Sequence, residues 1–247
     1  MNSAPPPVVN EPPEHFPGEV LEDLGDMPNY NDWIVSHFAP WLGGNAVEIG
    51  AGLGTISERL RGCVDRLDLV EPSPDLARRL TERFSVDDGL KVFDQTLEKW
   101  MEATQPATYD SIVMVNVLEH IEDDFAAARG LYDALKVGGA LLIFVPALPF
   151  LFSKLDKIYG HYRRYTKPTL RNCVSAAGFE IEKLHYVDVA GVIPWWLLNT
   201  ILGKTSFHGP SLQVYDKCVV PVTRICESVL HPPFGKNLIL VARKNES

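Results

Sequence analysis

The chain has no uninterrupted apolar stretch long enough to cross a membrane. Its longest apolar runs, "ALLIFVPALPFLF" and "VAGVIPWWLLNTILG", contain proline and fall short of the roughly 18 residues of a spanning helix. The first residues, "MNSAPPPVVNEPPEHFPG", include neither the basic nor the apolar segment of a secretion signal. These features predict a soluble, cytoplasmic protein with no transmembrane span and a disordered, proline-rich tail over residues 1–18.

Cysteine and basic residues are also scarce. The four cysteines form no C-x-x-C pair and no cluster with histidine, so we expect reduced structural thiols rather than a zinc site. With 23 Lys and Arg against 32 Asp and Glu, the formal net charge is -9. A nucleic-acid partner is therefore disfavoured, because phosphate backbones bind basic surfaces.

Strand-like and helical patterns alternate along most of the chain. A helical pattern ending at Gly43 and Gly44 comes first. Strand-like segments follow at residues 45–50, 66–72, 89–95, 109–118 and 140–146, with helical segments between them. Such strand–helix units in series predict an α/β fold with a doubly wound parallel sheet. A further helix and two late strands, at 180–189 and 237–244, flank a Trp-, Pro- and Leu-rich segment that is too long for an ordinary connection.

Three glycines follow the first strand in "VEIGAGLGTIS". Gly50, Gly52 and Gly54 allow a sharp turn and a close approach of a ligand to bare backbone. Thr55 occupies the third glycine position of a dinucleotide fingerprint, and no Gly-Lys-Ser/Thr of a phosphate loop is present. A tight structural turn without a ligand is the alternative. Glu71, at the end of the second strand, is placed to bind ribose hydroxyls, or it is an ordinary exposed acid.

Four segments carry a resemblance to a known family. "VEIGAGLGTIS", "LDLVEPS", "VFDQTLEKW" and "YDSIVMVNVLEHIEDD" resemble, in order and spacing, the cofactor motifs of class I S-adenosylmethionine-dependent methyltransferases. The resemblance is to the small-molecule group that includes the ubiquinone-pathway enzymes. It implies S-adenosyl-L-methionine as cofactor and S-adenosyl-L-homocysteine as product. It also implies a mostly parallel, seven-stranded sheet with helices on both faces and an antiparallel last strand.

The resemblance further implies one methyltransferase domain over residues 19–247, with two functional regions. Residues 28–145 would form the cofactor-binding core and residues 146–235 the acceptor-recognition region. The implied cofactor-binding residues are Tyr30, Glu48, Gly50, Ala51, Gly52, Gly54, Glu71, Pro72, Ser73, Asp94, Gln95, Thr96 and Asn116. Among these, the glycine loop would border the methionine part, Glu71 the ribose, and Asp94 the adenine amine. Tyr30 would close over the cofactor.

Two histidines are candidates for a catalytic base. Methyl transfer from a sulfonium requires alignment, a dry site and, where the acceptor loses a proton, a base. His120 in "NVLEHI" and His161 in "GHYRRYT" follow the fourth and fifth strands, where the active cleft should lie. A structural role is the alternative for each. No carboxylate cluster matches the magnesium site of catechol-type enzymes, so we expect metal-independent transfer.

The segments after the fifth strand are candidates for acceptor binding. "GHYRRYT" also resembles a segment of type 11/12 methyltransferase-domain proteins. One arginine of the loop could hold a carboxylate or phosphate of the acceptor; the alternative is an exposed ion pair with an acid such as Asp156. The segment around Trp195 is core, a lid or an interface, including one between copies of the chain. The predicted acceptor residues are Tyr159, Tyr162, Arg163, Arg164, Tyr165, Trp195 and Trp196.

The leading hypothesis is a methyltransferase acting on oxygen, nitrogen or carbon of a small, hydrophobic or aromatic acceptor, with specialised metabolism as a candidate setting. A non-catalytic cofactor-binding module on the same fold and an aminopropyl-transferring relative are the alternatives. A nicotinamide oxidoreductase is disfavoured by Thr55. The absence of an "NPPY"-like sequence after the fourth strand disfavours a nucleobase acceptor.

Overall fold

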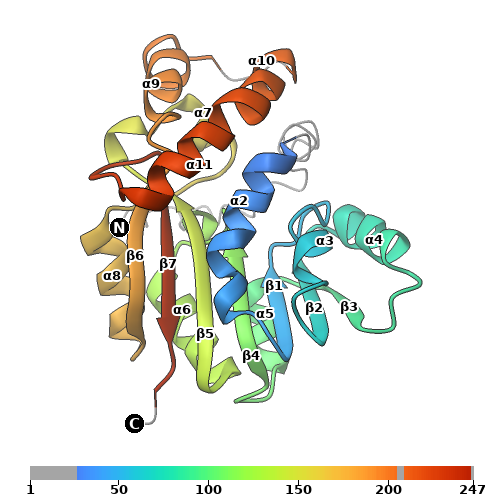
Figure 1. The fold of residues 1–247 in the computed structure, drawn as a ribbon. Helices are drawn as coiled ribbons and strands as arrows, with labels where there is room; N and C mark the ends of the chain where they lie inside the picture. The colour runs from blue at the N-terminus through green and yellow to red at the C-terminus, as the bar shows by residue number, and fades with distance from the viewer. Residues whose placement is uncertain (1–26, 205–208, 246–247) are drawn as a thin grey trace, which may run out of the picture.

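The computed structural model describes residues 27–204 and 209–245. The tail predicted for residues 1–18 lies outside this described part. In the described residues, seven strands form one sheet in the order β3-β2-β1-β4-β5-β7-β6. The strands are β1 Asn45–Ile49, β2 Arg66–Glu71, β3 Leu90–Asp94, β4 Tyr109–Val115, β5 Leu135–Pro146, β6 Glu180–Val187 and β7 Asn237–Arg243. β7 runs antiparallel to both β5 and β6, while the neighbours from β3 to β5 pair in parallel, which confirms the predicted fold (Figure 1).

Helices cover both faces of the sheet. One face packs against α2 Pro28–Phe38, α3 Ser57–Leu60, α4 Pro74–Arg83 and α11 Val220–Val229. The other packs against α5 Leu97–Ala103, α6 Asp124–Ala134 and α8 Lys167–Ala176. Because strand residues alternate between faces, Val47 belongs to one buried cluster and Ala46 to the other.

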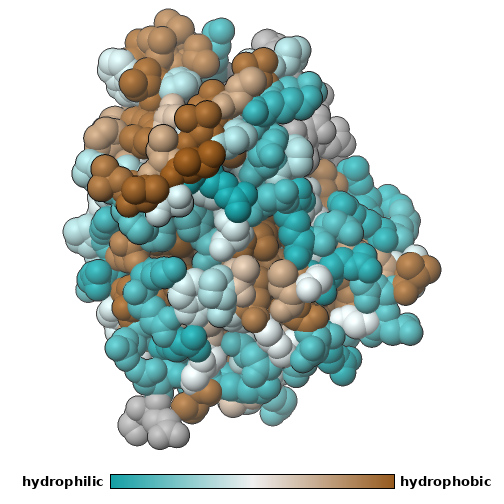
Figure 2. Space-filling model, in the orientation of Figure 1, coloured by the Kyte–Doolittle hydropathy of each residue, from teal (hydrophilic) through white to brown (hydrophobic). Residues whose placement is uncertain are grey.

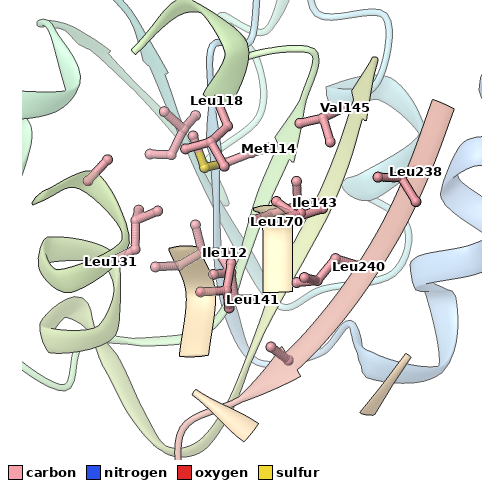
Figure 3. Close-up of a cluster of buried hydrophobic side chains, with 14 of the residues drawn as sticks. Ile112, Met114, Leu118, Leu131, Leu141, Ile143, Val145, Leu170, Leu238 and Leu240 are labelled. Carbon is pink, nitrogen blue, oxygen red and sulfur yellow. The ribbon is translucent and has the colours of Figure 1, made fainter. Parts of the chain in front are cut away.

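The central strands are buried on both faces and read as continuous apolar runs. Figure 3 shows Ile112 and Met114 of β4 beside Leu141 and Ile143 of β5, with Leu131 of α6 to their left. Leucine, isoleucine and valine in such strands each contribute about 1.5–3 kcal/mol by leaving water. This packing makes the sheet a rigid platform for the loops at its edges.

One strand boundary differs from the sequence prediction. β5 begins at Leu135, five residues before the predicted residue 140, because Gly138 adopts a positive φ of 80° and lets the chain stay paired through an irregularity opposite Tyr109. Ser73, one of the implied cofactor-binding residues, directly precedes α4, and its side chain makes no capping hydrogen bond.

The long segment between β6 and β7 forms its own helices. They are α9 Val192–Trp195, η4 Trp196–Ile201, α10 Gly209–Val214, η5 Tyr215–Val219 and α11. We call residues 189–204 and 209–230 the helical cap, because Figure 1 shows these helices above the edge of the sheet where β5 and β6 end. Two shorter elements, η3 Pro149–Leu151 and α7 Lys154–Ile158, follow β5 at the same edge.

Candidate active site at the carboxyl edge of the sheet

The glycine loop and Glu71 are joined by hydrogen bonds at the ends of β1 and β2. Backbone N–H groups of Gly50 and Ala51 donate to the carbonyl of Val70 at 2.8 and 3.2 Å. The Glu71 carboxylate accepts from the N–H of Gly52 at 2.8 Å and from that of Ser73 at 3.0 Å. Burial raises the pKa of Glu71, and these two donors oppose the rise. Glu71 is therefore turned toward the loop, as ribose binding requires.

Two glycines of the loop are required by the space around them. Gly50 has a φ of +73°, and a Cβ there would lie 2.5 Å from Cγ2 of Val117. Gly54 has a φ of +80°, and a Cβ there would lie within 3 Å of side-chain atoms of Leu80 and Phe84. Both positions thus exclude a side chain for conformational and steric reasons together.

Glu48 is buried on β1 below the loop. The hydroxyl of Ser57 donates to its carboxylate at 2.5 Å. Burial raises the pKa of Glu48 to about 8, and the nearby charge of Glu71 adds to the rise. A cationic group beside Glu48 would favour its ionised form, so this carboxyl suits an ammonium-bearing ligand.

The other predicted cofactor residues line the same edge, with one exception. Pro72 and Asp94 are exposed at the ends of β2 and β3. Asn116 follows β4, and its backbone lies in the left-handed conformational region, at φ 53°. Its backbone N–H donates to the carbonyl of Phe144 at 2.8 Å. Oε1 of Gln95 is buried and finds no hydrogen-bond partner within the described part of the chain.

Tyr30 is the exception. Its side chain is buried beside Phe144, and its hydroxyl donates to Asp188 at 2.9 Å, at the end of β6. The closing of Tyr30 over the cofactor stays a prediction.

His120 and His161 lie together next to this edge. Their ring centroids are 4.5 Å apart in an edge-to-face arrangement. Nδ1 of His161 lies 3.0 Å from Oδ1 of Asp156, which also accepts from Nε of Arg164 at 2.7 Å. Burial, followed by the charge of His161, lowers the pKa of His120 to about 3. The Asp156 carboxylate therefore contacts both the His161 ring and the Arg164 guanidinium.

Glu119, which sequence reasoning missed, completes this cluster. Its side chain is fully buried, and neither carboxylate oxygen accepts a hydrogen bond from another described residue. Burial raises its pKa to about 8, and Nε2 of His161 lies 3.9 Å away. One potential ligand atom from each of Glu119, His120 and His161 lies within 4.8 Å of the others, so the three residues could hold a cation. The adjacent Glu-His in the sequence was the available signal.

The two arginines of "GHYRRYT", Arg163 and Arg164, pair with carboxylates inside the protein. Arg164 is buried, donates to Asp156 and stacks 4.6 Å over the ring of Trp195. Arg163 pairs with Asp124 at 2.7 Å, and the hydroxyl of buried Tyr165 donates to the same carboxylate at 2.8 Å. The ion-pair alternative therefore describes both arginines, although Arg164 is buried rather than exposed.

The remaining predicted acceptor residues are more accessible. Tyr162 and Trp196 are exposed, and Tyr159 is half-buried 6.0 Å from the His161 ring. Trp195 is half-buried, and its indole N–H donates to the carbonyl of Leu151 at 3.1 Å.

Two hollows lie at the opposite edge of the sheet. One is lined by residues such as Asn45 and Arg66 at the starts of β1 and β2, and the other by Gly44 and Gly139. Ligands of doubly wound sheets bind at the carboxyl ends of the strands. We therefore place the active site at the glycine loop and not in these hollows.

A family model described as "Methyltransferase domain" matches residues 26–184. The chain belongs to this methyltransferase-domain family. It is an S-adenosylmethionine-dependent methyltransferase. In the described residues of this methyltransferase, no helix is both long and apolar enough to cross a membrane.

Three known proteins that are similar to this chain are also described as methyltransferases. A ubiquinone biosynthesis O-methyltransferase of Xanthomonas campestris pv. campestris (strain B100) is 28% identical over 170 residues, covering 62% of this chain and 68% of its own. A Thermotoga maritima structure described as an S-adenosylmethionine-dependent methyltransferase, possible histamine N-methyltransferase, has a TM-score of 0.63 at 20% identity and covers 94% of this chain and 97% of its own. Phosphoethanolamine N-methyltransferase 2 of Haemonchus contortus, in complex with S-adenosyl-L-methionine, has a TM-score of 0.60 at 18% identity over 88% of this chain and 53% of its own.

Proposed function

We propose that this enzyme methylates an oxygen, nitrogen or carbon atom of a small, hydrophobic or aromatic acceptor without a metal ion. One observation carries the proposal: the pair of Glu71 and Gly52 and the pair of Asp156 and His161 adjoin the same edge of the sheet. Because the Xanthomonas relative is named an O-methyltransferase, a hydroxyl is the first acceptor group to test.

The residues at the glycine loop fit the cofactor by their chemistry. Glu71 offers carboxylate oxygens to ribose hydroxyls, and the buried Oε1 of Gln95 offers an acceptor to the adenine amine. Glu48 suits the ammonium of the methionine part, which is cationic. When bound, S-adenosylmethionine supplies an electrophilic methyl group.

His161 is the better candidate for the base. Its Nδ1 lies 3.0 Å from Oδ1 of Asp156, which leaves Nε2 to take up a proton from the acceptor. His120 is a weaker base, because its lowered pKa of about 3 opposes proton uptake. We assign His120 to packing against His161. Tyr159, Tyr162 and Trp196 would form the aromatic wall of the acceptor site.

Calorimetry with S-adenosylmethionine and S-adenosylhomocysteine tests the cofactor site. Glu71→Ala removes an ionised partner of two hydroxyls, so we expect affinity to fall by at least about tenfold, as one charge-assisted hydrogen bond is worth roughly 1.5–3 kcal/mol. Glu102→Gln, an exposed carboxylate on α5, is the matched control and should bind normally. Absence of binding to the wild-type protein would overturn the proposal.

The reaction is tested with a panel of phenolic and amine acceptors, with methylated product detected by mass spectrometry. Tight cofactor binding with no product from any acceptor would favour the non-catalytic cofactor-binding alternative. Binding of the decarboxylated cofactor in preference to the intact one would instead favour aminopropyl transfer.

A further inference from the structure

The last helix of the cap, α11, is largely inverted: after Val220, which is buried in the core, its buried side chains are polar and its large apolar side chains are exposed. Thr223 and Glu227 are buried, whereas Val222, Ile225 and Val229 are 61%, 68% and 85% exposed. Surface helices of globular proteins normally show the opposite arrangement, with the apolar stripe against the core. The apolar stripe of α11 thus has no partner within the described part of the chain.

The other helices of the cap repeat this pattern. Asn199 in η4 and Asp216 in η5 are buried. Asp216 accepts from the backbone N–H of Tyr30 at 2.8 Å, at the start of α2. The exposed large apolar residues of these helices are Ile193, Trp196, Leu197, Ile201, Leu202 and Val214.

Buried polar contacts fix this orientation. The Glu227 carboxylate accepts from the backbone N–H groups of Asp188 and Val189 at 3.1 and 2.9 Å. Asp188 in turn accepts from Tyr30 and pairs with Lys236 at 2.9 Å. Turning α11 to bury its apolar stripe would break these bonds and leave buried polar groups without hydrogen-bond partners. The apolar residues are therefore held outward by the fold.

The outward residues form a surface at one end of the molecule. Figure 2 shows hydrophobic residues gathered over the cap, above a mostly hydrophilic body. Large exposed apolar patches on proteins mark sites of interaction with other proteins or with membranes. The cap patch lies at the same edge of the sheet as the active site.

The charges of the cap select the partner. Between residues 189 and 235 the sequence has two acids, Asp216 and Glu227, and both are buried. The basic residues Lys204, Lys217 and Arg224 are exposed there, in a chain of net charge -9. A second copy docked symmetrically on this face would oppose basic residues to basic residues. An anionic lipid surface complements both the charge and the apolar side chains.

We propose that the helical cap docks this enzyme on the surface of anionic membranes. The exposed apolar side chains of α9, η4, α10 and α11 enter the outer hydrocarbon of the leaflet, and the three basic residues face lipid headgroups. Trp196 lies at the interface, the depth that tryptophan favours. Docking brings the active-site edge to the lipid, so that a membrane-dissolved acceptor is within reach. The docking itself does not depend on the proposed acceptor.

Vesicle co-sedimentation tests the docking. The protein should pellet with vesicles of phosphatidylcholine plus phosphatidylglycerol and much less with phosphatidylcholine alone. The triple variant Leu197→Gln, Ile225→Gln, Val229→Gln should bind at least about tenfold more weakly, because each side chain loses apolar burial. Lys217→Gln should weaken binding about fivefold, as one basic residue near such a surface is worth about 1 kcal/mol.

Two exposed valines far from the cap provide the matched control. Val86 and Val137 are 93% and 55% exposed, and Val86→Gln with Val137→Gln should bind vesicles as the wild type does. Binding of S-adenosylhomocysteine by every variant establishes that it is folded. No vesicle binding by the wild type, or equal losses in the control, would overturn the proposal. A dimer in gel filtration that the triple variant dissociates would also overturn it, in favour of a second copy.

Discussion

Gly50 allows the sharpest stability test of the glycine loop. In Gly50→Ala the new Cβ would lie 2.5 Å from Cγ2 of Val117, in a residue held at φ +73°. A left-handed alanine costs about 1–2 kcal/mol and overpacking about 1–3 kcal/mol, so we expect a loss of about 2–5 kcal/mol. Gly160 has the same φ of +73° but nothing within 4 Å of an added Cβ. Gly160→Ala should therefore lose only the conformational part, about 1–2 kcal/mol.

Urea unfolding of the two variants measures these losses. Replacing glycine by alanine also restricts the unfolded chain. This effect is the same in both variants, so it cancels when their free energies of unfolding are compared. Adding Val117→Ala to Gly50→Ala should restore about 1–3 kcal/mol, because it removes the clashing methyl groups. Equal losses in the Gly50 and Gly160 variants, with no rescue by Val117→Ala, would refute the steric account of the loop.

The buried ionisable groups make three further outcomes testable. His161→Ala should lower kcat about 10²–10⁴-fold without weakening cofactor binding, and His120→Ala much less; equal, mild losses would mean that neither is the base. Chelation should leave kcat unchanged, and a loss restored by Mg²⁺ or Zn²⁺ would assign Glu119, His120 and His161 to a cation instead. Burial lowers the pKa of His37 to about 4 and of His185 to about 3, from an ordinary value of 6.5. Because the unfolded chain binds more protons below 6.5, stability should fall as pH drops from about 6.5 toward 4, and His37→Gln should flatten this fall in urea titrations; an unchanged slope in that variant would contradict the reasoning.

The parts of the fold that sequence reasoning predicted well are those with local signals. Apolar runs between helical patterns located the strands, and the spacing of Gly50, Gly52 and Gly54 located the turn. Glu71 was predicted because it ends a strand beside that turn, and in the structure it accepts from the loop at Gly52. Each of these inferences needs only neighbours within one strand–helix unit.

The contacts that sequence reasoning left open depend on distant partners. Tyr30 was assigned to the cofactor, and the fold adds a hydrogen bond from its hydroxyl to Asp188, 158 residues along the chain. For Arg163 and Arg164 the sequence left an anion clamp and an ion pair open, and only the fold identifies Asp124 and Asp156 as their partners. A charged side chain in a sequence carries no sign of whether its partner is a ligand or another part of the chain.

The orientation of the helical cap depends on both a local sequence pattern and distant contacts. Its apolar residues suggested core, lid or interface, and periodicity alone could not decide, because either face of such a helix can be the buried one. The decision comes from Asp216 and Glu227, whose carboxylates accept backbone N–H groups of α2 and of the turn after β6. A buried carboxylate without hydrogen-bond donors costs more free energy than a valine side chain exposed to water. The arrangement that gives the buried acid its two donors is therefore favoured, although it exposes valine. Polar anchoring therefore determines which surface the enzyme presents, and it presents the apolar one.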